Sequence, residues 1–152
     1  MSQPLTALGF DFGRARIGVA AGQAITASAS PIATVEARAG TPDWAHIDRL
    51  VAEWQPDALV IGVPVHLDGT EQPLTQAARR FGRQLEARYG LPVHAADERL
   101  SSRAASAEIA AARNAGNGRR TRKGDVDRLA ARLILEQWLG NRPEHDDSQH
   151  NR

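Results

Sequence analysis

The chain has 152 residues, of which 41% are apolar and 24% charged, and its formal net charge is +1, so any contact with a polyanion must come from a local basic patch. It contains no cysteine, which excludes disulfides, thiol nucleophiles and cysteine zinc sites. The sequence lacks a signal-peptide pattern, and its longest apolar stretch, residues 58–65, is too short to span a bilayer, so we expect a cytoplasmic protein without membrane contact.

The first part of the chain predicts an antiparallel meander followed by a helix. Three strands are expected at residues 5–12, at 16–22 and within 25–36. The first two are joined by a tight turn around Gly13. Thr41 and Pro42 are typical of a helix start, and apolar residues then recur at helical spacing as far as Trp54.

The rest of the chain predicts alternating strands and helices. The expected elements are a strand at 57–63, a helix at 74–89, a strand at 91–97, a helix from about Ser101 and a last helix from about Asp125 to Leu139. A helix between two strands usually makes a right-handed parallel crossover. We therefore expect an α/β fold with a mixed five-stranded sheet, three antiparallel strands and then parallel ones, flanked by helices. Residues 1–140 would form one domain, and the polar tail 141–152 is predicted to be disordered.

Asp11 is an acid inside an apolar strand. Alternation places Phe10 and Phe12 on one face and Asp11 on the other, with Gly9 and Gly13. A buried carboxylate needs a partner. Two interpretations remain open: Asp11 binds a cation, or it accepts hydrogen bonds from the turn that follows.

Glu98 follows a predicted strand. Open α/β sheets bind ligands outside the carboxyl ends of their strands, which makes this acid a candidate site residue. An acid at the start of the next helix would also be favoured by the helix dipole alone.

Asp127 lies near the start of the last predicted helix, together with Asp125. At about 100° per residue, Asp127 falls between Ile134 and Trp138 on the apolar side, whereas Asp125 falls on the polar side beside Glu136. We expect Asp127 to face the sheet and Asp125 to face water, which makes Asp127 the third candidate metal ligand.

Carboxylates from separate segments can converge on divalent cations. Mg²⁺ prefers hard oxygen ligands, and two such ions about 4 Å apart can activate a water and stabilise the leaving oxygen in phosphodiester cleavage. The five histidines fit neither the HxxH nor the HExxH spacing and are assigned no site. The alternative is that the acids serve folding only.

A basic segment precedes the last helix. Five basic residues, Arg113, Arg119, Arg120, Arg122 and Lys123, lie within eleven residues that contain no acid. Such a loop would neutralise phosphates, although it could also be a solvated basic loop. Arg14 and Arg16, beside Asp11, are further candidate nucleic-acid contacts. The arginines within 74–89 are interpreted as a solvated helix face.

Four segments, FDFGRARIGVA, GVPVHLDGTEQP, ADERLSS and KGDVDRLAARLIL, together resemble the YqgF/RuvX family of Holliday junction resolvase-like proteins, nucleases of 16S rRNA precursor processing. The resemblance covers roughly residues 5–140. It implies a ribonuclease H-like fold in which Asp11, Glu98 and Asp127 are the catalytic acids that bind Mg²⁺ or Mn²⁺. The loop implied beside the site contains Gly62, Pro64, Asp68, Gly69 and Thr70. His66 occupies a position where the family is expected to have asparagine.

The resemblance thus implies a metal-dependent endonuclease that uses two metals in 5′-end processing of 16S rRNA precursor. Two alternatives remain: a Holliday junction resolvase acting on DNA, and a non-catalytic RNA-binding module. Actin-like ATPases and sugar kinases share a similar phosphate-binding strand turn, but they need two duplicated lobes, which 152 residues cannot supply. The oligomeric state is left open.

Overall fold

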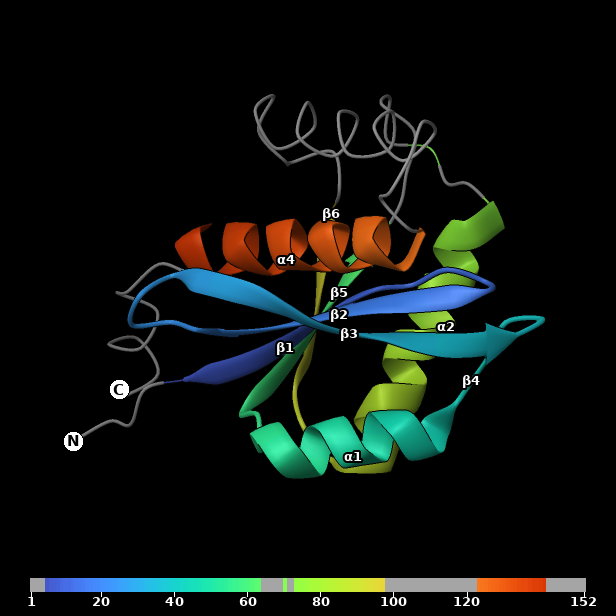
Figure 1. Cartoon of the computed structure of the whole chain (residues 1–152), viewed down its shortest axis with the longest axis horizontal. Coiled ribbons are helices and arrows are strands. Elements are labelled where there is room, and N and C mark those ends of the chain that lie inside the picture. Colours follow the sequence, from blue (N-terminus) through green and yellow to red (C-terminus); the bar gives the residue numbers. More distant parts are fainter. Residues whose placement is uncertain (1–4, 64–69, 71–72, 98–122, 142–152) are drawn as a thin grey trace.

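A computed structural model describes residues 5–63, 70, 73–97 and 123–141, with backbone alone at 97, 123–127 and 141. The described elements are β1 (Thr6–Asp11), β2 (Arg16–Gln23), β3 (Ser28–Arg38), β4 (Thr41–Pro42), α1 (Trp44–Trp54), β5 (Ala58–Val63), α2 (Pro73–Tyr89), β6 (Val93–Asp97) and α4 (Lys123–Asn141). The helix predicted near Ser101 and tail residues 142–152 lie outside the described residues. Helices cover both faces of the sheet (Figure 1).

The strands form one mixed six-stranded sheet in the order β4-β3-β2-β1-β5-β6. β1, β2 and β3 pair antiparallel, as the meander predicted, whereas β5 and β6 continue the sheet parallel to β1. The parallel half follows from the helices, because α1 and α2 each return the chain to the starting edge of the next strand. The predicted mixed α/β architecture is therefore confirmed.

The sixth strand corrects one detail of the sequence interpretation. Thr41 and Pro42 do not start a helix but form the short strand β4, paired with the end of β3. Helix α1 starts later because Asp43 is its N-cap, and the Asp43 carboxylate accepts a hydrogen bond from the His46 backbone N–H at 3.4 Å.

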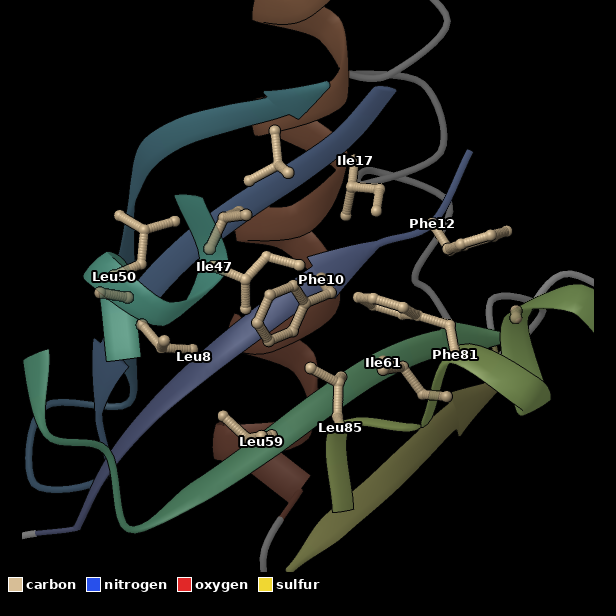
Figure 2. Packing of buried hydrophobic residues seen from close by; sticks show 14 of the residues in the cluster. Leu8, Phe10, Phe12, Ile17, Ile47, Leu50, Leu59, Ile61, Phe81 and Leu85 are labelled. Atoms are coloured by element: carbon tan, nitrogen blue, oxygen red, sulfur yellow. The ribbon is translucent and has the colours of Figure 1, made fainter. Parts of the chain in front are cut away.

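The larger core lies between the sheet and the pair α1 and α2. Leu8 and Phe10 of β1 point to this side and are fully buried, and Phe81 of α2 packs edge-to-face on Phe10 with ring centroids 5.6 Å apart (Figure 2). Phe12 also packs on Phe81, at 5.1 Å. The alternate residues of β1 therefore face the opposite side of the sheet, as the sequence predicted.

An ion pair joins the two helices of this face. The Arg88 guanidinium donates two hydrogen bonds to the Asp48 carboxylate, at 2.9 and 2.8 Å, and the Tyr89 hydroxyl donates a third at 2.5 Å. These donors hold the pKa of Asp48 well below its usual range. Arg88 also lies 5.1 Å from the centroid of the Trp44 ring. This arginine therefore links α1 to α2 rather than forming a purely solvated face.

A second core lies on the other face, under α4. It joins small residues of the sheet to apolar residues of the helix: Ala7, Ala20 and Val60 with Ala131, Ile134, Leu135 and Leu139. Figure 1 shows α4 lying across the sheet on the side opposite α1. None of the helices within the described ranges is both long and apolar enough to cross a membrane.

Gly9 sets how closely α4 approaches β1. A Cβ atom at this position would lie 2.8 Å from Cβ of Leu135 and 3.3 Å from the Ala131 carbonyl oxygen. Even a methyl group would therefore push the helix away from the sheet.

We expect Gly9→Ala to lower the free energy of unfolding by about 1–3 kcal/mol, because it overpacks this contact. Chemical denaturation measures the change. Gly140→Ala is the matched control, since a Cβ at that helical position meets nothing within 4 Å, and it should be neutral or slightly stabilising. Equal stability of Gly9→Ala and wild type would contradict the close approach.

Candidate functional site

Asp11 is the last residue of β1, at the edge where the parallel strands β1, β5 and β6 all end. Its side chain is half-buried, whereas both neighbouring phenylalanines are buried. The strand ends one residue before the predicted end at residue 12, and the carboxylate occupies the edge where open α/β sheets bind their ligands.

The residues paired with Asp11 are glycines on both sides. In register, Asp11 lies opposite Gly18 of β2 and opposite Gly62 of β5. Ala96 of β6 and Thr34 of β3 continue the same row across the sheet. Residues in one row project on the same face. The two positions that flank Asp11 within the sheet therefore contribute no side chain.

This face of the row is the one that α4 covers. Gly9 faces Ala131 and Leu135 of α4. Gly22, which pairs with Ala7 at the start of β1, faces Leu139. Helix α4 therefore runs antiparallel to β1.

Asp127 can be placed from this register. Asp11 lies two residues beyond Gly9, about 6.5 Å further along the strand. Four residues of helix, about 6 Å, separate Ala131 from the backbone of Asp127. The turn of α4 that contains Asp127 thus lies at the level of Asp11.

A side-chain contact supports this placement. Arg128 of α4 donates a hydrogen bond from Nη1 to Oγ1 of Thr34, at 2.6 Å. Thr34 belongs to the row of Asp11, through Gly18. Sequence analysis missed this pair, which is separated by 94 residues. The only signal was the position of Arg128 next to Asp127.

The polar side of α4 is partly buried against β3. Glu136 accepts a hydrogen bond from the Ala29 backbone N–H of β3, at 3.2 Å, and its carboxylate lies 3.8 Å from Arg132. The side chains of Arg132 and Glu136 are only 29% and 32% exposed. One polar side of α4 therefore follows β3.

The connection between β1 and β2 passes beside Asp11. Gly13 is required there, because a Cβ would lie 2.6 Å from the Arg16 carbonyl oxygen. The backbone of Arg14 is held to the end of β3 by a hydrogen bond from Gly40 at 3.1 Å. Arg14 is exposed, and Arg16 is half-buried and in register with Glu36. Both arginines therefore lie at the edge of the sheet where β1 ends with Asp11.

Many of the predicted site residues lie outside the described part of the chain. These are Pro64, Asp68, Gly69, Glu98, Arg113, Arg119, Arg120 and Arg122, together with His66. Thr70 is described and exposed, and Lys123 is the first residue of α4. Among the residues that are described, no three histidines or acids form a group that could hold a metal ion. The predicted triad includes Glu98 and the side chain of Asp127, which are not among them.

The donor that the structure does place suits a hard divalent cation. Asp11 supplies carboxylate oxygens at the sheet edge, between two glycines. The described histidine nearest in the sheet, His94 of β6, instead packs on Trp138 with ring centroids 4.9 Å apart. Carboxylate oxygens are hard donors of the kind that Mg²⁺ and Mn²⁺ prefer.

Two solved structures share the fold of this chain. The chain superposes on Thermus thermophilus RuvC in complex with a Holliday junction substrate with a TM-score of 0.54 and 16% identity, covering 90% of this chain and 97% of that one. The Fowlpox virus Holliday junction resolvase gives a TM-score of 0.52 and 13% identity, covering 91% and 100%. The fold is thus the ribonuclease H-like fold of the resolvases.

A model of the RuvX family, described as Holliday junction resolvase, matches residues 5–141. Two relatives carry the name "Putative pre-16S rRNA nuclease". The protein from Legionella pneumophila is 51% identical over 87% of this chain and 93% of its own length. The protein from Azotobacter vinelandii is 47% identical over 94% and 99%. The chain belongs to the RuvX family, which confirms the resemblance noted in the sequence, and it is a nuclease.

Proposed function

We propose that the protein is a metal-dependent endonuclease of the cytoplasm that hydrolyses phosphodiester bonds in 5′-end processing of 16S rRNA precursor. One observation carries the catalytic part: Asp11 stands at the carboxyl edge of the sheet, between Gly18 and Gly62, at the level of the α4 turn that contains Asp127. The name of the relatives supports the rRNA substrate.

Three carboxylates would hold the metal in this proposal: Asp11, Glu98 and Asp127. Glu98 directly follows β6 and comes two positions after Ala96, which packs on the α4 side of the sheet. Bound Mg²⁺ or Mn²⁺ would supply an activated water and stabilise the leaving oxygen.

The basic residues around this edge would bind the substrate backbone. Arg14 and Arg16 start from the β1–β2 connection, and the segment that ends at Lys123 leads into α4. Contacts of this kind neutralise phosphates without reading the sequence of the nucleic acid. They would orient the scissile phosphate toward Asp11.

We expect cleavage to require Mg²⁺ or Mn²⁺ and to stop in excess EDTA, since the proposed ligands are all carboxylates. Ca²⁺ should support binding but little cleavage, because it prefers more ligands and looser geometry. Single-turnover cleavage across a panel of these ions tests the requirement, with an electrophoretic shift as the readout of binding. Full activity in EDTA would overturn the metal-dependent mechanism.

A four-way DNA junction is the second candidate substrate. It is favoured by the description of the matching family and by the resolvases that share the fold. The deciding experiment compares an RNA fragment spanning the 5′ end of mature 16S rRNA with a four-way junction, under identical metal and salt conditions. Preferred cleavage of the RNA supports the proposal, preferred cleavage of the junction replaces it, and binding without cleavage of either indicates a non-catalytic module.

A further inference from the structure

We infer that the Arg128–Thr34 hydrogen bond positions the first turns of α4, and thereby Asp127, for metal binding at Asp11. Arg128 and Thr34 would be positioning residues, which act on the metal site through Asp127. The inference rests on the proposed function, because it concerns the metal-dependent site proposed above.

The Arg128–Thr34 contact joins α4 to the row of the sheet that contains Asp11. The bond is 2.6 Å long and partly buried, and it joins the second turn of α4 to β3. Thr34 lies in the same row as Asp11, with only Gly18 between them. The contact therefore sets the distance between α4 and the sheet at the row of residues that contains Asp11.

The apolar packing described for α4 lies C-terminal to Asp127. The residues of α4 in the second core are Ala131, Ile134, Leu135 and Leu139. All of them lie C-terminal to Asp127, and among the residues before Ala131 whose side chains are described, 128–130, none belongs to that cluster. Among the described side chains, the Arg128–Thr34 bond joins α4 to the sheet one residue away from Asp127.

Helix α4 has a comparable polar contact nearer its C-terminal end. Glu136 accepts a hydrogen bond from the backbone N–H of Ala29, at 3.2 Å. Both contacts join α4 to β3, but only the first lies in the row of Asp11. Glu136→Ala is therefore a matched control for a lost contact between α4 and β3.

A direct contact between Arg128 and a substrate phosphate is the competing explanation. A substitution of Thr34 distinguishes this explanation from a positioning role. Thr34→Val removes the hydroxyl with little change of shape and leaves the charge of Arg128 in place. If Arg128 positions the helix, Thr34→Val and Arg128→Ala should both weaken Mn²⁺ binding. The salt dependence of substrate binding should then be the same as in wild type. If Arg128 binds phosphate, Thr34→Val should behave as wild type, and Arg128→Ala should flatten the salt dependence.

The experiment measures Mn²⁺ affinity by calorimetry in the absence of substrate, for Thr34→Val, Arg128→Ala and Glu136→Ala. Loss of a group that orients a metal ligand typically weakens metal binding or activity by 10–100-fold. We expect Mn²⁺ affinity to fall by about 10-fold in the first two variants and to stay within about twofold of wild type in Glu136→Ala. Arg128→Lys and Thr34→Ser, which keep a donor and an acceptor, should recover most of the affinity.

Amide hydrogen exchange of the metal-free protein gives a readout that does not depend on metal or cleavage. Thr34→Val should speed exchange in the first turns of α4, whereas Glu136→Ala should speed it near the other end of the helix. Wild-type Mn²⁺ affinity in both Thr34→Val and Arg128→Ala would overturn the inference. An equal loss of affinity in Glu136→Ala would also overturn it, since the effect would then reflect general loosening.

Failure of the proposed function would look different. If the wild-type protein neither binds Mn²⁺ nor cleaves either substrate, the metal-dependent function itself is wrong, and the inference falls with it. If wild type binds the ion and cleaves, while the two positioning variants behave as wild type, only the inference fails.

Discussion

Asp11→Asn is expected to lower the rate of cleavage by at least about 100-fold while the protein remains folded. Asparagine keeps the shape of the side chain but lacks the charge that would bind the metal. Asp11 lies at the open edge of the sheet, with glycines at the paired positions on both sides. The substitution should therefore disturb packing very little, and stability without metal should stay within about 1 kcal/mol of wild type.

Single-turnover cleavage with saturating Mn²⁺, alongside thermal unfolding with and without the ion, distinguishes a ligand from a structural acceptor. If Asp11 only accepts hydrogen bonds, the variant should be destabilised and its activity should follow the folded fraction. Glu53→Gln is a suitable control, because Glu53 is an exposed acid on α1, across the sheet from α4. It should retain wild-type cleavage.

Asp127→Asn should abolish cleavage to a similar extent, whereas Asp125→Ala should retain it. Asp127 belongs to the turn of α4 that lies at the level of Asp11, one turn before the fully buried Ala131. Asp125 lies on the same side of the helix as Arg132 and Glu136, the side that lies along β3. Its removal should cost no more than a weakened helix start, about 0.5 kcal/mol.

Stability without metal gives a second test of the same pair. Three carboxylates that share one site repel each other until a cation binds. Asp127→Asn should therefore be at least as stable as wild type in EDTA and should gain less stability than wild type when Mn²⁺ is added. An inactive Asp125→Ala combined with an active Asp127→Asn would refute this assignment of the third ligand.

The strands and their faces could be predicted because local patterns determine them. Alternation in β1 placed Phe10 and Asp11 on opposite faces, and the structure buries Phe10 between the sheet and α2. Strand β4 could not be predicted in the same way. Thr41 and Pro42 satisfy the rules for a helix start, and their pairing depends on where β3 ends.

Only part of the site could be predicted from local patterns, because its geometry depends on register between distant segments. The neighbours of Asp11 in sequence predict that it lies in a strand, close to the end of that strand. Gly18 and Gly62 flank Asp11 only because β1 pairs antiparallel with β2 and parallel with β5. The contact of Thr34 with Arg128 needs the correct β2–β3 register as well, including the irregularity between Val19 and Ala20. No periodicity encodes that register.

The two faces of the sheet are completed at different times during synthesis. The core under α1 and α2 is built from residues between Leu8 and Val93, so it can form while the chain is still being made. The other core needs Ala131 to Leu139, which the ribosome adds on the order of seconds later. Since α4 also carries Asp127, a nascent chain should fold much of its sheet before it can cut. Nuclease activity would therefore be acquired only after the last helix has been made.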